Sequence, residues 1–345
     1  MKAAVLKGKG QLEVTDFPEP PLAPGCVKIA VSYCGLCGTD LHKFAGRAGS
    51  RPVVYPVPLG HEASGVVAEL GEGVTSFAIG DRVVVDPNWH CGRCWYCQNG
   101  KTHLCSASRG VVKGMAEYIC PPVDNVYRVP GSLPLKYAAL SEPLSCCLRG
   151  TDNLGALPGE TVAVIGCGSI GQMMLQILSR IAGKIAAIDL APEKEKAALE
   201  NGADIFVCSA GGGVKEKLAA AGFEHIGRVI ECVGHPSASE LALDIADRGA
   251  TVVLFGVGAP DAAASLKLYE SFTKELTVKF SYIDPFTTER AVAMLACGKI
   301  DPEKLISAEI GLDELPEEII TRRYCSSGKV IVRISGEDPA RRPLC

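Results

Sequence analysis

The sequence predicts an α/β protein of two domains, a β-rich, barrel-like domain and a doubly wound domain built on a parallel sheet. Its 345 residues suffice for two cores of ordinary size. The first 150 residues contain short β-rich runs that Pro, Gly and Asp interrupt. From Gly159 onward, apolar strands alternate with helical stretches.

The β-rich runs of the first domain are Val27 to Val31, Gly65 to Glu69 and Arg82 to Val85. Their shortness and the turn residues between them favour an irregular antiparallel arrangement. We therefore expect a small barrel rather than a flat, regular sheet.

The second domain opens with a βαβ pattern, which implies parallel strands. We expect strands at Thr161 to Ile165, Ile185 to Ile188, Ile205 to Cys208, Arg228 to Glu231 and Thr251 to Phe255, and helices at Met173 to Ala182, Pro192 to Asn201 and Ala238 to Ala246. A helix at Thr288 to Ala296 and a strand at Lys329 to Ile334 form too short a tail for a third domain. The predicted domains are 1–149 with 285–345, and 150–284.

The amino-acid composition indicates which kind of partner and which cellular compartment to expect. The 39 acidic and 35 basic residues are mixed along the chain, which argues against a nucleic-acid-binding surface. The N-terminus lacks an apolar signal region and no apolar run reaches 18 residues, so we expect a cytoplasmic protein without a membrane segment. In that reducing compartment the 16 cysteines are free or bind metal.

Four cysteines have the spacing of a structural zinc site. The segment CGRCWYCQNGKTHLC contains Cys91, Cys94, Cys97 and Cys105. Two-residue gaps let neighbouring thiolates converge on one tetrahedral ion, and four sulfurs leave no open position. The alternatives are four unrelated core cysteines or a nucleic-acid-binding zinc ribbon, and the acidic charge balance disfavours the ribbon.

A glycine turn follows the first strand of the second domain and precedes a helix. It comprises Gly166, Gly168, Ser169, Ile170 and Gly171, and fits the GxGxxG pattern with Cys167 after the first glycine. Such a turn lets a pyrophosphate approach the backbone N–H groups of a helix N-terminus. Asp189, about twenty residues on, is placed to accept hydrogen bonds from ribose hydroxyls and to repel a 2′-phosphate, which favours NAD. A plain strand-to-helix turn is the alternative.

Candidates for an open metal site are Cys37, His61, Glu62 and Glu142. Thiolate, imidazole and carboxylate form the mixed donor set of a catalytic zinc that keeps one position for water or substrate. Spacing alone does not bring these distant residues together. His61 has the alternative of an ordinary interior histidine, and Glu142 that of a carboxylate favoured by a helix N-terminus.

Five ordered segments resemble the zinc-containing medium-chain dehydrogenases over essentially the whole chain. They are GLCGTDLH, LGHEASGVVAELGEGV, CGRCWYCQNGKTHLC, SEPLSCC and GCGSIG. The resemblance implies a GroES-like catalytic domain, a Rossmann domain, two zinc ions per chain and a reaction site in the cleft between the domains. GTDLH and SEPLSCC are most similar to the polyol dehydrogenase branch, near the threonine dehydrogenases.

The resemblance also assigns roles. Cys37 and His61 would bind the catalytic zinc, Glu62 would be a ligand or a reserve ligand, and Glu142 would lie beside the metal. Thr39 would accept the alcohol proton and pass it by the cofactor ribose toward His42, although His42 has the alternative of a solvent-facing residue and Thr39 that of a helix cap.

Further expectations concern the substrate, the adenine and the assembly. Lys194 would lie near the adenine, unless it is simply solvated, and Phe44 and Tyr282 would line the substrate pocket unless they are core residues. Relatives that oxidise sorbitol often carry an arginine where this chain has Ser281, so sorbitol itself is disfavoured. The resemblance implies a homodimer or homotetramer, with an edge near Thr251 to Val257 pairing across subunits.

Three functions are therefore open. The favoured function is hydride transfer from a secondary alcohol of a polyol or sugar alcohol to NAD. The alternatives are a threonine-type amino-alcohol dehydrogenase and a non-catalytic protein that binds zinc and dinucleotide.

Overall fold

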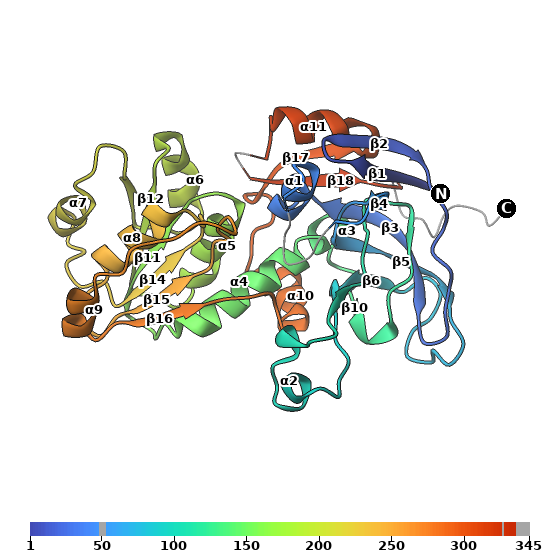
Figure 1. Ribbon diagram of the computed structural model, residues 1–345, viewed down its shortest axis with the longest axis horizontal. Coiled ribbons are helices and arrows are strands. Elements are labelled where there is room, and N and C mark those ends of the chain that lie inside the picture. Colours follow the sequence, from blue (N-terminus) through green and yellow to red (C-terminus); the bar gives the residue numbers. More distant parts are fainter. Residues whose placement is uncertain (48–52, 326–327, 336–345) are drawn as a thin grey trace. The chain divides into compact units, whose positions relative to one another are not determined.

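The structure is a computed structural model that describes residues 1–47, 53–325 and 328–335. It divides into two compact units (Figure 1). The first comprises Met1–Pro143, Thr288–Gly298 and Ile306–Cys345, and the second Leu144–Thr287 and Lys299–Leu305. Among the described residues, no helix has both the length and the apolar character needed to cross a membrane.

The first unit is mainly antiparallel. Its strands are β1 (Lys2–Gly8), β2 (Gln11–Asp16), β3 (Val27–Gly35), β4 (Val57–Pro58), β5 (Glu62–Leu70), β6 (Arg82–Val85), β7 (Asn88–Trp89), β8 (Arg109–Gly110), β9 (Tyr118–Ile119), β10 (Val126–Arg128), β17 (Ile306–Gly311) and β18 (Lys329–Arg333). Its helices are α1 (Gly38–Phe44), α2 (Trp95–Gln98), α3 (Leu135–Ala138), α10 (Thr288–Ala296) and α11 (Leu315–Thr321), and α4 (Ser141–Leu154) continues into the second unit.

The main sheet of this unit runs in the order β10-β6-β5-β3-β18-β17, with β9 also paired to β3. Strand β18 thus lies beside β3, which is about 300 residues earlier in the chain, and the pairing between β17 and β18 is parallel. One apolar core lies under β3, β5 and β6 and includes Val27, Val67 and Val83. The predicted runs fall within these strands, which are rich in the β-branched residues valine and isoleucine.

The second unit is a doubly wound parallel sheet in the order β13-β12-β11-β14-β15-β16. Its strands are β11 (Thr161–Ile165), β12 (Lys184–Asp189), β13 (Ile205–Cys208), β14 (Arg228–Glu231), β15 (Thr251–Leu254) and β16 (Thr277–Phe280), and its helices are α5 (Ser169–Leu178), α6 (Glu195–Glu200), α7 (Val214–Ala220), α8 (Pro236–Ile245) and α9 (Leu268–Lys274). This strand order is that of a dinucleotide-binding Rossmann domain.

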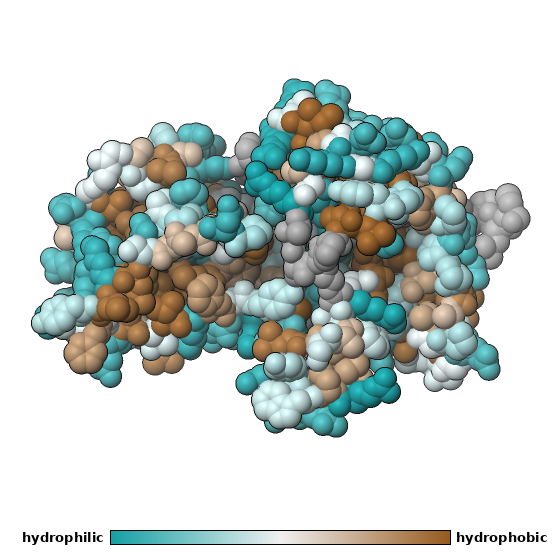
Figure 2. Space-filling model, viewed as in Figure 1, coloured by the Kyte–Doolittle hydropathy of each residue, from teal (hydrophilic) through white to brown (hydrophobic). Residues whose placement is uncertain are grey.

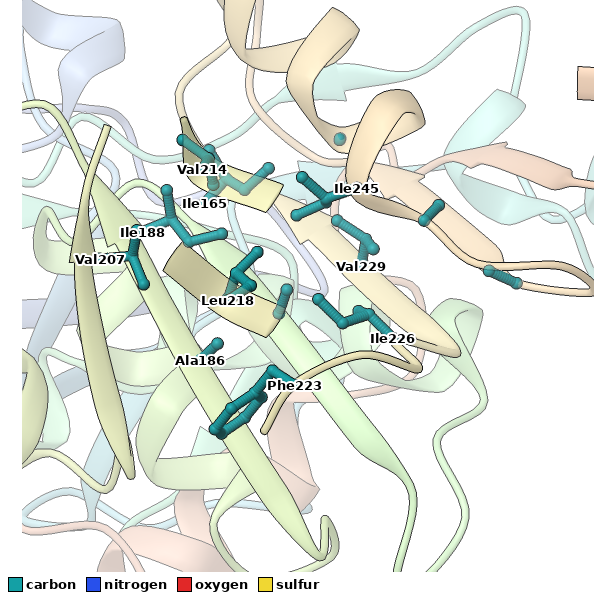
Figure 3. Packing of buried hydrophobic residues seen from close by; sticks show 14 of the residues in the cluster. Ile165, Ala186, Ile188, Val207, Val214, Leu218, Phe223, Ile226, Val229 and Ile245 are labelled. Atoms are coloured by element: carbon teal, nitrogen blue, oxygen red, sulfur yellow. The ribbon is translucent and has the colours of Figure 1, made fainter. Parts of the chain in front are cut away.

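Helices cover both faces of this sheet. Figure 3 shows Val214 and Leu218 of α7 beside Ile165, Ile188 and Val207 of the strands, in a core that α8 completes. Side chains alternate along a strand, so Val164 points to the opposite face. A Cβ built on Gly171 of α5 would lie 3.8 Å from Cγ1 of Val164, which places α5 on that face.

Two sequence-based expectations about this unit were wrong. Lys299–Leu305 packs with the second unit, because Gln176 exchanges two hydrogen bonds with the Asp301 backbone, at 2.7 and 3.0 Å. The segment near Thr251 is not a sheet edge, because β15 pairs with β14 on one side and β16 on the other. The edge strands are β13 and β16. Thr277–Phe280 of β16 alternates polar and apolar residues, but the run is only four residues long and was not predicted as a strand.

Candidate active site

The Cys37 and His61 side chains, predicted to bind metal, come together in the first unit. Sγ of Cys37, a ring nitrogen of His61 and a carboxylate oxygen of Glu62 all lie within 4.8 Å of one another. Cys37 follows β3 and is the N-cap of α1, while His61 directly precedes β5 and Glu62 begins it, and β5 pairs with β3. Strand pairing therefore supplies the proximity that the separation along the chain does not.

Charge interactions favour a thiolate at Cys37. Burial by itself raises the pKa of the Cys37 thiol, but the charge of His61 and a hydrogen bond with it outweigh burial and lower the pKa. Burial likewise lowers the pKa of His61, and the Cys37 thiolate reverses this and raises it. Since a metal ion takes the place of the imidazole proton, this pair is suited to bind one and release a proton.

Glu62 completes the donor set. The side chain is fully buried, and its Oε1 accepts a hydrogen bond from Nζ of Lys329 at 2.7 Å. Its Oε2 has no hydrogen-bond partner among the described residues. An unpaired buried carboxylate oxygen is costly, so this atom fits the coordination of a cation. Thiolate, imidazole and carboxylate together match the donors of a catalytic zinc.

Asp40 organises this site, although no role for it was expected from the sequence. It is fully buried, and its two oxygens accept hydrogen bonds from Gly60 N at 3.1 Å and Cys37 N at 3.2 Å. Its Oδ1 also lies 3.9 Å from Nδ1 of His61. Its place three residues after the N-cap is a capping-box position, which is the signal that identifies it in the sequence.

Thr39 and His42 lie on α1, three positions apart and hence on one helix face. Thr39 is exposed and His42 is half-buried. The alternative of Thr39 as a helix cap is wrong, because Cys37 is the N-cap and Asp40 accepts the hydrogen bond from its backbone N–H. Phe44 packs against the apolar core of this unit, as its alternative reading predicted.

Glu142 is the second residue of α4. Its charge contributes to the raised pKa values of His61 and Lys329, so it lies within electrostatic reach of the metal-ligand candidates. It is outside the group formed by Cys37, His61 and Glu62, so its place beside the metal stays a prediction.

The four cysteines of the loop around α2 form a second cluster, in a segment that extends from the sheet strands of the unit in Figure 1. The sulfur atoms of Cys94 and Cys97, and those of Cys91 and Cys105, are 3.5 Å apart. Zinc bonds of about 2.3 Å to four tetrahedral sulfurs require separations of about 3.8 Å. The cluster therefore fits a structural zinc ion without rearrangement of the backbone.

The glycine turn of the second unit leaves room for a ligand. Gly166 has a φ of 92°, and a Cβ on Gly171 would lie 1.8 Å from Gly166 O, so both positions require glycine. A Cβ on Gly168 would meet nothing within 4 Å. Gly168 is the N-cap of α5, with Ser169 and Ile170 in the first turn, so the open space lies at a helix N-terminus that attracts anions.

Asp189 ends β12 and holds this turn. Its Oδ2 accepts a hydrogen bond from Cys167 N at 2.6 Å, and its Oδ1 accepts one from Ala191 N at 2.9 Å. Each oxygen retains a further lone pair for a ribose hydroxyl. Lys194 lies nearby in a short 3-10 turn, Pro192–Lys194. Burial raises the pKa of the Cys167 thiol, and the charge of Lys194 lowers it in part.

Comparison with known proteins identifies the family. Residues 23–131 match the profile "Alcohol dehydrogenase GroES-like domain" and residues 169–296 match "Zinc-binding dehydrogenase". An alcohol dehydrogenase of Geobacillus stearothermophilus is 33% identical over 88% of this chain and 90% of its own length. The chain belongs to the zinc-containing alcohol dehydrogenase family. Within this family, the D-altritol 5-dehydrogenase of Agrobacterium fabrum is also 33% identical, over 91% of this chain and 94% of its own.

Solved dehydrogenase structures have the same fold. A zinc-binding dehydrogenase structure from Sinorhizobium meliloti, bound to NADP, has a TM-score of 0.90 and 34% identity, covering 96% of this chain and 98% of its own. An Escherichia coli alcohol dehydrogenase in complex with NADH has a TM-score of 0.88 and 27% identity, covering 96% and 99%. The predicted family, the GroES-like and Rossmann fold and the dehydrogenase class are confirmed.

Proposed function

We propose that this dehydrogenase transfers hydride from a secondary hydroxyl of a polyol or sugar alcohol to NAD, with Cys37, His61 and Glu62 as ligands of the catalytic zinc. The convergence of these three side chains, with Oε2 of Glu62 lacking a hydrogen-bond partner in the part of the chain that the structure describes, is the observation that supports it most directly. A bound zinc would supply Lewis acidity toward the alcohol oxygen. The four-cysteine cluster would hold a second, structural zinc.

The residues of the chain provide the proton path and the cofactor site. The hydroxyl of Thr39 would accept the alcohol proton, and His42, one helical turn later, suits its release because histidine changes charge near neutral pH. Gly166, Gly168 and Gly171 would admit the pyrophosphate at the start of α5.

NAD is favoured over NADP by the charge at the end of β12. The carboxylate of Asp189 would accept ribose hydroxyls and repel a 2′-phosphate. Leu190 and Ala191, the next two residues, bring no positive charge to offset that repulsion.

The polyol substrate is supported by the D-altritol 5-dehydrogenase, a relative that matches this chain over nearly its whole length. Ser281 hydrogen-bonds with Asn153 at 3.1 Å, in the position where the resemblance associates an arginine with sorbitol oxidation. We therefore expect polyols other than sorbitol to be preferred.

A substrate panel tests this function. Polyols, sugar alcohols, threonine and simple secondary alcohols are assayed with NAD and with NADP. We expect the highest kcat/KM with a polyol and NAD. Highest turnover of threonine, or turnover of simple alcohols alone, would reject the polyol assignment.

Replacing a ligand separates the metal from the cofactor. Cys37→Ala should abolish turnover and remove one zinc per chain while NAD binding persists. Cys297→Ala, at an exposed thiol of the same unit, is the matched control. Activity retained in Cys37→Ala would show that the catalytic metal lies elsewhere.

We also propose that the enzyme is a homo-oligomer that associates through the β16 edge. All residues of β16 are exposed, and Phe280 is 76% exposed. On neighbouring α9, Tyr269 and Phe272 are each 81% exposed, and Figure 2 shows hydrophobic side chains gathered over this region. An unpaired edge with exposed apolar residues is suited to pair with another copy.

Light scattering during gel filtration tests the assembly. We expect a mass of at least twice the 36.2 kDa of one chain, and a monomer after Phe280→Lys. A monomeric unmodified enzyme would contradict the proposal.

A further inference from the structure

Lys329 is a buried lysine that no step of the proposed reaction uses. Its side chain is 3% exposed, and its Nζ donates hydrogen bonds to Oε1 of Glu62 at 2.7 Å and to Leu36 O at 3.2 Å. A buried ammonium group must be paired, since burial without a partner is strongly unfavourable. The partner of Lys329 is thus one of the metal-ligand candidates.

The pairing spans three strands and depends on a glycine. Glu62 is on β5 and Lys329 begins β18, with β3 between them. Gly35 of β3 lies opposite Glu62 in the pairing, and a Cβ on it would be 1.9 Å from Oε2 of Glu62. The missing side chain at Gly35 therefore leaves the space through which the carboxylate crosses β3 toward Lys329.

The two carboxylate oxygens of Glu62 have different surroundings. Oε1 is bound to Lys329, whereas Oε2 has no partner among the described residues. One of the carboxylate oxygens lies within 4.8 Å of the donor atoms of Cys37 and His61. Lys329 is nearly inaccessible, so its positive charge acts on the metal site with little screening by salt.

We infer that Lys329 is a positioning residue for metal exchange: it restrains Glu62 through Oε1 and so makes that carboxylate a weak, releasable ligand of the catalytic zinc. Its ammonium group withdraws electron density from the carboxylate and repels a dication. Removing Lys329 has two opposing effects: loss of its charge strengthens the bond between Glu62 and zinc, and loss of its hydrogen bond lets the Glu62 side chain reorient. Because strand pairing still fixes the Glu62 backbone, we expect the first effect to be the larger. The inference rests on the proposed metal site.

Zinc release from the holoenzyme tests this role. The enzyme is mixed with excess of the chromogenic chelator 4-(2-pyridylazo)resorcinol and the release of each zinc is followed in time. Lys329→Met should slow release of the faster-released catalytic zinc about tenfold, whereas removal of a partner that strengthens its ligand would weaken metal binding about 10–100-fold and speed release. Release from the four-cysteine cluster should not change and serves as an internal reference.

Three further variants separate charge, hydrogen bonding and folding. Lys329→Arg keeps the charge and should release zinc within about twofold of the unmodified rate, the precision expected of such comparisons. Lys329→Gln keeps a donor without the charge and should slow release, which provides a test if Lys329→Met does not fold. Lys28→Met removes a lysine of the same unit that pairs with Glu19 and Glu69, and should leave the rate unchanged.

Unchanged or faster release from both neutral variants would overturn the role of Lys329. If Cys37→Ala still contains two zinc ions, or the unmodified enzyme contains only one, the proposed metal site itself is wrong. The two failures are therefore distinguishable.

Discussion

The substitution Gly168→Ala should weaken the binding of dinucleotide while changing the stability of the Rossmann unit very little. Gly168 has a φ of −73° and a ψ of −170°, which an alanine adopts without strain, and its Cβ would have no neighbour within 4 Å. Restricting the unfolded chain stabilises by about 0.4–1 kcal/mol. Alanine is a poorer N-cap than glycine by an opposing amount of about 0.5 kcal/mol. We therefore expect the stability of the NAD-free protein to change by less than about 1 kcal/mol.

The effect on NAD should be much larger. If the pyrophosphate approaches the backbone at Gly168, the added methyl occupies the space it needs. Inserting a methyl group into a close contact costs about 1–3 kcal/mol. That free energy corresponds to a dissociation constant about 5 to 150 times higher.

Calorimetry of the NAD-free protein and titration with NAD provide the two measurements. Gly227→Ala is the matched control, since Gly227 is in the same unit, outside the left-handed region and also without a neighbour within 4 Å. It should leave NAD binding unchanged. Unaltered NAD affinity in Gly168→Ala would refute the placement of the pyrophosphate at Gly168. A large loss of stability would show that the added methyl group does meet neighbouring atoms in the NAD-free protein.

Three other changes test the organisation of the sites. Asp40→Asn leaves one buried N–H facing an amide donor, so we expect a loss of about 1–3 kcal/mol by calorimetry and faster zinc release, with the exposed Asp204→Asn as control. Gly35→Ala displaces Glu62 from Lys329 and should cost about 3–5 kcal/mol, whereas unaltered melting would contradict their pairing. Asp189→Ala should lower the ratio of NAD to NADP efficiency about tenfold or more, and an unchanged ratio would reject its role.

The secondary-structure elements could be predicted where a pattern of neighbouring residues indicates them. The βαβ pattern gave the parallel sheet, and helix α10 has the predicted bounds, Thr288–Ala296. The edge strand β16 and helix α9 were not predicted, because both are short and no residue of either is buried, although β16 does alternate polar and apolar residues. The assignment of β16 depends on its pairing with β15, which joins residues 26 positions apart along the chain.

The sequence by itself determined the features that depend on short spacings: the four cysteines around α2 and the glycine turn before α5. Such groups meet because the chain between them is too short to separate them. Only the tertiary structure decided that Cys37 meets His61 and that Lys329 meets Glu62, 267 positions away. These contacts arise from the register of β5, β3 and β18, and register is a property of paired strands rather than of any one segment.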